Sequence, residues 1–290
     1  MRALTWCWVA VTALAVTGCG VVSPVVTEDP VEPLPVITIG SDGTAVSELV
    51  ASLYVAALKA AGEPAEVVEV TPGTETLALG DNHPMAMPVY AATWLQEFST
   101  EPATFDTATT ITDLATAVAP AIGVLESSAV DGGLVWAVDP ESELVSLTDL
   151  AALPAGTAVV APAFAMTSAS GVPALEAAYG AKLAAEPLDD PAERAAALAD
   201  GHAAAAFRRT ESIDLAGLDV LTDPVGIFTP DPLVAAVAAE FADQRPDAVL
   251  VLDAVQSALT DDSLAELAAS AAVDGLDPAL AQWLAERGLG

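Results

Sequence analysis

The sequence has 290 residues, 53% of them hydrophobic, so it is long enough to bury the core of one large domain or of two lobes. Its charge is lopsided, because 41 Asp and Glu residues stand against 8 Lys and Arg residues and the net charge is −33. Such a surface repels nucleic acid and anionic lipid headgroups, so both are excluded as specific partners.

The first residues have the pattern of a secretory signal. Arg2 is followed by an apolar run from Ala3 to Val16, which is shorter than the about 20 apolar residues needed to cross a membrane. The run leads into Val-Thr-Gly-Cys, which resembles the bacterial lipobox, whose cysteine receives the lipid. We therefore expect a signal peptide over residues 1–18 and lipidation of Cys19. An ordinary secretory signal followed by an incidental cysteine is the alternative.

Residues 19–35 are rich in proline and acidic residues and cannot form a packed element. They are expected to form an extended tether that holds a folded domain off the membrane while the lipid supplies the anchor. Cys7 is the only other cysteine, so the mature chain would have no internal disulfide and no free thiol for catalysis. This organisation predicts a location at the outer face of the cytoplasmic membrane.

The rest of the chain alternates short β-type runs with segments of helical periodicity. Val36–Gly40 is predicted as a strand that ends at Gly-Ser-Asp-Gly, and apolar residues from Val46 to Ala57 follow at helical spacing. Glu66–Val70 is the next strand, and such a strand–helix–strand unit favours a parallel sheet. The further predicted elements are strands at 85–89, 122–125, 134–138, 157–161 and 203–207, an extended stretch after 221, and helices at 109–118, 147–153, 173–179, 191–199, 246–259, 262–272 and 278–287. An α/β body with a helical C-terminal end is expected.

The sequence has few residues arranged as a catalytic or metal site would require. His83 and His202 lie in unrelated segments without metal-ligand spacing, and the sequence has no Gly-x-Ser-x-Gly elbow, phosphate-binding loop or His-Glu-x-x-His motif. The acidic residues are so numerous that any chosen carboxylate pair is weak support for a site. We therefore expect no enzyme, no metal site and no cofactor, with a cell-surface hydrolase as the alternative that a broad hydrolysis screen would test.

Five segments resemble, in the same order, segments of the glycine betaine/choline/carnitine substrate-binding proteins of ABC importers. They are VITIGSDGTAVSELVASLYVAALKAAG at 36–62, MPVYAATWL at 87–95, IGVLESSAVDGGLVWAV at 122–138, SLTDLAAL with APAFAMTSASGVPALEAAYG between 146 and 180, and LTDDSLAELAASAAVDGLDPALAQWLAERGL at 259–289. The resemblance covers residues 36–290. It rests on a Gly-Ser after the first strand, a Pro-x-Tyr, a Gly-x-Pro-x-Leu helix and a closing helix pair.

This resemblance implies an α/β, two-lobed type II periplasmic-binding-protein fold, in which each lobe is a sheet flanked by helices. Residues 36–120 and 222–290 would form the first lobe and residues 121–221 the second, and two crossovers would act as a hinge that closes on a ligand. The implied function is that of a monomeric solute-binding lipoprotein. It would deliver a small polar solute, favouring a quaternary amine or betaine, to ABC permease and ATPase subunits on other chains. A sensor or structural lipoprotein without transport is the alternative.

The family holds a quaternary ammonium group in a cage of aromatic rings, because ring faces attract a desolvated cation. Tyr90 stands at the Pro-x-Tyr position and is expected in the cage; a tyrosine packed at a strand end is the alternative. Trp136 is a second candidate, because it shares a strand face with Leu134, which stands where the family has a tyrosine. Further wall candidates, each with a core residue as the alternative, are Phe164, Trp94 and Phe228.

The family holds the carboxylate of betaine-like ligands with basic side chains and backbone donors. Here Ser41 is followed by Asp42 where the family often has lysine, and Thr167 stands where it has arginine. Arg208 and Arg209 are adjacent, directly after a predicted strand, and ligands gather at the carboxyl ends of strands in open α/β sheets. We expect the Gly-Ser loop residues at the site and one arginine on the carboxylate. An ion pair with nearby acids is the alternative for the arginines.

Overall fold

The structure, a computed structural model, describes residues 35–99, 106–168, 170–211 and 215–290. The predicted signal peptide, the predicted lipidation site Cys19 and all of the tether except residue 35 lie outside these ranges. Within them, no helix combines the length and the hydropathy that crossing a membrane requires. The same ranges contain no group of three or more His, Cys, Asp or Glu side chains placed to hold a metal ion.

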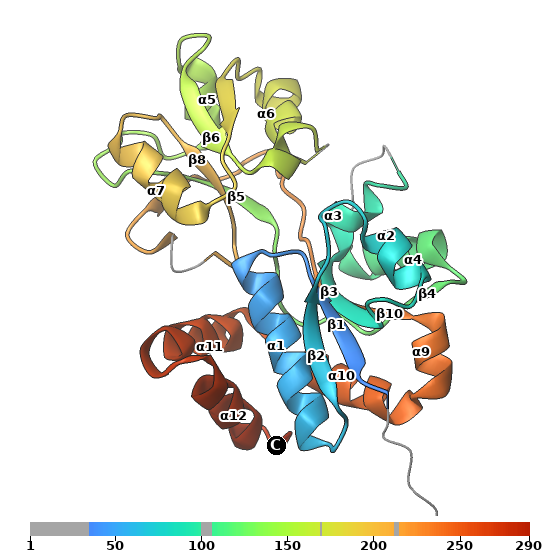
Figure 1. The fold of residues 1–290 in the computed structure, drawn as a ribbon. Helices are drawn as coiled ribbons and strands as arrows, with labels where there is room; N and C mark the ends of the chain where they lie inside the picture. Colours follow the sequence, from blue (N-terminus) through green and yellow to red (C-terminus); the bar gives the residue numbers. More distant parts are fainter. Residues whose placement is uncertain (1–34, 100–105, 169, 212–214) are drawn as a thin grey trace, which may run out of the picture. The chain divides into compact units, whose positions relative to one another are not determined.

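The first sheet has five strands in the order β2-β1-β3-β10-β4 (Figure 1). These strands are β1 (Ile37–Ser41), β2 (Ala65–Glu69), β3 (Ala86–Tyr90), β4 (Ile122–Val124) and β10 (Leu233–Ala238). β1 pairs in parallel with β2 and β3, whereas β10 runs antiparallel to β3 and β4. The parallel strand–helix–strand unit predicted at the start of the domain is therefore confirmed, within a sheet that is mixed as a whole.

Helix α1 (Ala45–Ala60) connects β1 to β2 and has clear sequence signals at both ends. Thr44 caps the first turn, because its hydroxyl accepts a hydrogen bond from the backbone N–H of Ser47 at 3.3 Å. Gly62 follows the helix with φ +87°, a left-handed conformation that glycine adopts without steric cost. These signals fix where the helix begins and ends, as the periodicity predicts.

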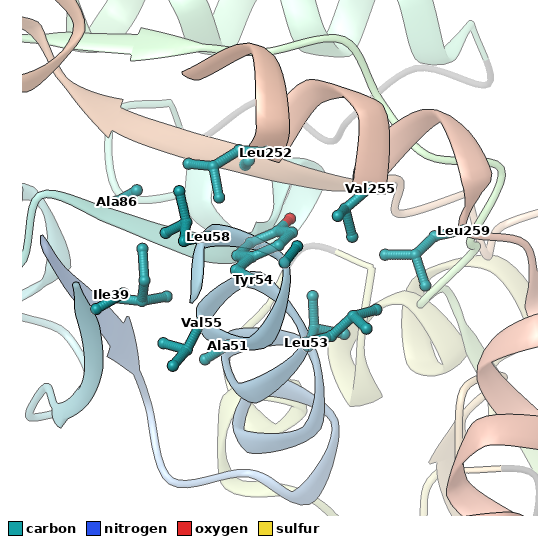
Figure 2. Packing of buried hydrophobic residues seen from close by; sticks show 14 of the residues in the cluster. Ile39, Ala51, Leu53, Tyr54, Val55, Leu58, Ala86, Leu252, Val255 and Leu259 are labelled. Carbon is teal, nitrogen blue, oxygen red and sulfur yellow. The ribbon is translucent and has the colours of Figure 1, made fainter. Parts of the chain in front are cut away.

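The apolar face of α1 forms the centre of the first core. Tyr54 and Leu58 are fully buried, and they lie with Leu252 of helix α10 (Pro246–Ala258) in the cluster drawn in Figure 2. Burying a side chain of this size stabilises a fold by about 1.5–3 kcal/mol relative to leaving it exposed. The long N-terminal helix therefore joins the first sheet to the C-terminal helices.

The second sheet also has five strands, in the order β7-β6-β8-β5-β9. These are β5 (Leu134–Val138), β6 (Ala158–Ala161), β7 (Ala184–Pro187), β8 (Ala205–Arg208) and β9 (Asp219–Val220). β6 is parallel to β7 and β8, whereas β5 is antiparallel to β8 and β9. Most residues of β7 and β9 are exposed, so neither carries the apolar pattern from which a strand is predicted, and both were missed.

The other helices flank the two sheets. They are α2 (Glu75–Gly80), α3 (Ala91–Leu95), α4 (Thr107–Val118), α5 (Leu147–Ala152), the 3-10 helix η1 (Ala163–Met166), α6 (Val172–Tyr179), α7 (Pro191–Ala199), α9 (Ala239–Gln244), α11 (Asp261–Asp274) and α12 (Leu276–Glu286). The sequence does not predict α2, α3, η1 and α9, which have six residues or fewer, whereas the equally short α5 was predicted. The closing helix pair is α11 and α12, drawn in red in Figure 1.

Two segments connect the sheets, residues 125–133 from β4 to β5 and residues 221–232 from β9 to β10. They lie side by side, because the backbone N–H of Gly132 donates a hydrogen bond to the carbonyl of Asp231 at 2.9 Å. The α/β class with two mixed sheets, each flanked by helices, is therefore confirmed. The paired crossovers bring residues from both sheets to one place.

One element differs from the expected division into lobes. The second lobe was expected to begin at residue 121, but β4 pairs with β10 in the first sheet, with Val124 opposite Ala236. A three-residue apolar strand fits either sheet by composition, and only its tertiary partner decides between them. The crossover therefore begins after β4.

Candidate functional site

Arg208 is the last residue of β8, opposite Leu134 of β5, and its side chain is only 12% exposed. Its guanidinium reaches elements of both sheets. Nη1 donates hydrogen bonds to the carbonyl of Gly132 at 2.8 Å and to Oδ2 of Asp231 at 3.1 Å, and Nη2 donates to Oγ1 of Thr93 at 3.1 Å. Arg208 thus links the second sheet to both crossovers and to helix α3.

Two aromatic rings lie against the same guanidinium. Cζ of Arg208 is 4.1 Å from the ring centroid of Tyr90 and 4.2 Å from that of Phe164. Both distances are well inside the range of about 6 Å in which the electron-rich face of a ring attracts a cation. Tyr90 ends β3 and Phe164 belongs to η1, directly after β6, so each sheet supplies one ring.

Asp231 supplies the negative charge at this position and is only 5% exposed. Besides Arg208, its carboxylate accepts hydrogen bonds from the backbone N–H of Ala92 at 2.7 Å and of Thr93 at 3.2 Å, and from the Thr93 hydroxyl at 2.5 Å. A buried charge is tolerated only when it is paired and hydrogen-bonded, and both conditions are met here. Two ring faces and one carboxylate therefore surround a single cationic group.

The ring of Tyr90 is fixed on two sides. Its hydroxyl is 2.7 Å from Oγ1 of Thr210, and a Cβ placed on Gly132 would lie only 2.0 Å from Cε1 of the ring. Burial raises the pKa of Tyr90, although the positive charge of Arg208 opposes the rise, so the phenol stays protonated. The neutral ring can therefore keep both its hydrogen bond and its face toward the cation.

A buried ion pair holds the end of β8 in place. Arg194 of α7 is fully buried, and its Nη2 pairs with Oε2 of Glu211 at 2.5 Å. The same Glu211 oxygen accepts a hydrogen bond from the backbone N–H of Arg208 at 2.9 Å. The position of the Arg208 backbone thus depends on a charge pair that does not itself contact the rings.

The space around the guanidinium is nearly full. The remaining cavity has a volume of ≈ 10 Å³, which is room for about one water molecule. It is lined by Ala92, Thr93, Gly133, Leu134, Phe164, Ser170, Arg208, Phe228, Thr229 and Asp231. The Arg208 side chain therefore occupies most of the site that the two sheets form.

The structure separates the two adjacent arginines that the sequence places at the site. Arg208 lies at its centre, whereas Arg209 is 49% exposed and pairs with Asp131, Nε to Oδ2, at 3.3 Å. Arg208 ends β8, whereas Arg209 lies just beyond the strand with its side chain at Asp131, so only Arg208 faces the rings. Each arginine thus makes an ion pair with a nearby acid, which was the alternative for both of them.

Two of the aromatic candidates lie at the cavity and two lie away from it. Phe164 and Phe228 line the cavity. Trp136 is 1% exposed and packs in the core of the second sheet, and Trp94 is 4% exposed and donates a hydrogen bond from its indole N–H to Oγ1 of Thr76 at 3.1 Å. Neither tryptophan lines the cavity.

Ser41 and Asp42 lie away from the cavity, at the turn into α1. The Ser41 hydroxyl accepts a hydrogen bond from the backbone N–H of Gly43 at 3.2 Å. Oδ1 of Asp42 accepts one from the backbone N–H of Thr44 at 2.9 Å and one from its hydroxyl at 2.7 Å. Both side chains thus shape the loop before the helix and contribute nothing to the cavity wall.

Sequence reasoning missed Asp231, Thr93, Gly132 and Thr210. Asp231 is one of 41 acidic residues, and composition gave no reason to prefer it. Its position in the sequence could have identified it, because it lies at the end of the return crossover, just before the apolar run that forms β10. Thr93 was within reach too, since it lies three residues after the Pro-x-Tyr tyrosine.

Comparison with known proteins identifies the family to which the fold belongs. Residues 35–286 match the family model described as the substrate binding domain of ABC-type glycine betaine transport systems. No curated protein sequence matches the chain.

Solved structures share the fold. A glycine betaine/carnitine/choline ABC transporter protein has a TM-score of 0.69 at 17% identity, covering 87% of this chain and 99% of that one. Apo YehZ from Escherichia coli has a TM-score of 0.63 at 21% identity, covering 88% and 99%. Lactococcal OpuAC, in a closed conformation with glycine betaine, has a TM-score of 0.61 at 12% identity, covering 87% and 96%. These likenesses show a type II periplasmic-binding-protein fold.

The family model spans both sheets, both crossovers and every side chain that contacts the Arg208 guanidinium. The match covers nearly all of the residues that the structure describes. The protein therefore belongs to the family of substrate-binding domains of ABC-type glycine betaine transport systems.

Proposed function

We propose that this chain binds a betaine-type solute between Tyr90 and Phe164 and hands it to an ABC importer. Family membership makes it an extracytoplasmic solute-binding protein that works with permease and ATPase subunits, and not a member of an enzyme family. The choice of a quaternary amine or betaine as ligand is the proposal. In the same proposal the protein is a monomer that a lipid on Cys19 holds at the outer face of the cytoplasmic membrane.

One observation carries the choice of ligand. The rings of Tyr90 and Phe164 lie 4.1 and 4.2 Å from the same cationic carbon, and the buried carboxylate of Asp231 faces the same group. Ring faces and a carboxylate stabilise a cation that lacks its hydration shell. A trimethylammonium group has no N–H to satisfy, so it needs ring faces more than it needs acceptors. Solved relatives that carry glycine betaine or choline in their names have the same fold.

Calorimetry of the purified full-length protein tests this ligand class. We expect glycine betaine to bind and glycine, which has the same carboxylate but no methyl groups on nitrogen, to bind far more weakly. Tyr90→Ala is expected to weaken betaine binding by about 1–2 kcal/mol, because one ring face is lost. Tyr90→Phe keeps the ring and loses only the bond to Thr210, so it should retain most of the affinity. Equal binding of betaine and glycine would contradict the proposal.

The lipid anchor has a separate test. Cys19→Ser should release the protein from the membrane fraction, because the thiol is the predicted attachment site. Cys7→Ser is the matched control, since it changes the only other cysteine within the predicted signal and should leave the protein with the membranes. Fractionation of cells followed by a salt wash is the measurement. A Cys19→Ser protein that stays with the washed membranes would overturn the anchor.

A further inference from the structure

The guanidinium of Arg208 has every contact that a cationic ligand group would require at this site. It lies between two ring faces, at 4.1 and 4.2 Å from their centroids, and within 3.1 Å of the Asp231 carboxylate. Its donors are also used, on the carbonyl of Gly132 and on the hydroxyl of Thr93. The chain thus carries its own cation between the two rings, where the proposed ligand would place its cation.

Among the residues that the structure describes, the cavity beside the guanidinium leaves no room for a second cation. The cavity left around the guanidinium has a volume of ≈ 10 Å³, whereas a trimethylammonium group is several times larger than the one water molecule that such a space holds. Gly132 packs closely against the ring of Tyr90 and Thr210 hydrogen-bonds its hydroxyl, so both hold the ring beside the guanidinium. A ligand cation can therefore reach the rings only when the Arg208 side chain leaves them.

We infer that Arg208 is a tethered competitor that sets the ligand specificity of the site. This inference rests on the proposed function. A purely cationic solute such as choline must displace the guanidinium of Arg208 but has no anionic group to bind it. The guanidinium then loses the Asp231 carboxylate and gains no new partner. A zwitterion such as glycine betaine offers the displaced guanidinium a carboxylate, and a charge-assisted hydrogen bond offsets the exchange. The arginine thus selects for solutes that carry both charges.

The test compares choline and glycine betaine by calorimetry on the full-length protein and on Arg208→Met, which keeps an apolar stem without the charge. Choline is expected to bind Arg208→Met about tenfold more tightly than the wild type, because its competitor is gone. Betaine gains the same space but loses its partner for the carboxylate, so its affinity should change less. The preference for betaine over choline should therefore fall by about the same factor.

Three further variants make the result specific. Arg209→Met removes the neighbouring, 49% exposed arginine and should leave both affinities unchanged. Arg208→Lys keeps a cation at the rings and should retain the preference for betaine. Arg208→Gln repeats the test in a polar form if the methionine variant fails to fold, which thermal unfolding of each protein monitors.

The outcomes separate this inference from the proposed function. A gain for choline in Arg208→Met or Arg208→Gln, absent in Arg209→Met, supports the tethered competitor. If the wild type binds betaine and neither variant gains affinity for choline, Arg208 is not a competitor, while the proposed ligand class stands. If neither betaine nor choline binds any of the proteins, the ligand class is wrong and the inference fails with it.

Discussion

Arg194→Met is expected to lower the free energy of unfolding by about 3–5 kcal/mol, because it leaves the part-buried Glu211 carboxylate and two backbone carbonyls without their donor. The Arg194 side chain is 0% exposed and pairs with Glu211, whose side chain is 17% exposed. Its Nη1 also donates hydrogen bonds to the carbonyls of Leu188 at 2.9 Å and Asp189 at 2.6 Å. Methionine keeps much of the volume but supplies none of these donors, and an unpaired buried polar group costs its full desolvation penalty.

Chemical denaturation of the full-length protein measures this loss. Arg209→Met is the matched control, since its ion pair with Asp131 is half exposed and should be worth at most about 1 kcal/mol. Betaine binding should also weaken in Arg194→Met, because Glu211 accepts the backbone N–H of Arg208 and loses its orientation. If the two methionine variants unfold at the same denaturant concentration, the Arg194–Glu211 pair does not stabilise the fold.

Gly132→Ala is expected to weaken betaine binding at least about tenfold, because the new methyl group displaces the ring of Tyr90. A Cβ at this position would lie 2.0 Å from Cε1, 2.4 Å from Cδ1 and 2.7 Å from Cζ of that ring. Such distances are far below van der Waals contact, so the ring must swing away. In doing so it loses its place against the cation and its hydrogen bond to Thr210.

Two comparisons make the Gly132→Ala result interpretable. Gly80→Ala adds a methyl group where nothing lies within 4 Å, so its betaine affinity should equal that of the wild type. In a Tyr90→Ala background the clash at Gly132 no longer exists, and the second substitution should then cost little, which is the non-additivity expected of residues in contact. Additive losses in the double variant would mean that Gly132 acts on the ligand by some route other than the Tyr90 ring.

Much of the fold could be predicted because its long elements carry their own signals. Helix α1 has apolar periodicity from Val46 to Ala57, a threonine cap and a following glycine, and in the structure it spans Ala45–Ala60. Short elements such as α3 and β7 carry no such pattern. Which strands pair with each other leaves no pattern in the sequence at all. β4 joined the first sheet because Val124 meets Ala236, a contact that composition does not encode.

The site, too, was only partly predictable from the sequence. Tyr90, Phe164 and Arg208 were predicted at the ligand and the structure brings them together, but the role expected of the arginine did not include stacking on the rings. Trp136 shares its strand face with Leu134, which lines the cavity. Each residue advances a strand by about 3.3 Å, so two residues further on the same face already lies in the core.

The small size of the cavity beside Arg208 bears on how the protein unloads. In the inferred competition, the guanidinium returns to the rings and to Asp231 when a solute leaves, so release exposes neither an empty apolar cavity nor an unpaired charge. The side chain is present at a fixed effective concentration whatever the supply outside, and the apparent Kd equals the intrinsic Kd divided by the fraction of time that the rings are free. If Arg208 competes in this way, we expect the protein to fill where solute is plentiful and to release it readily at the permease.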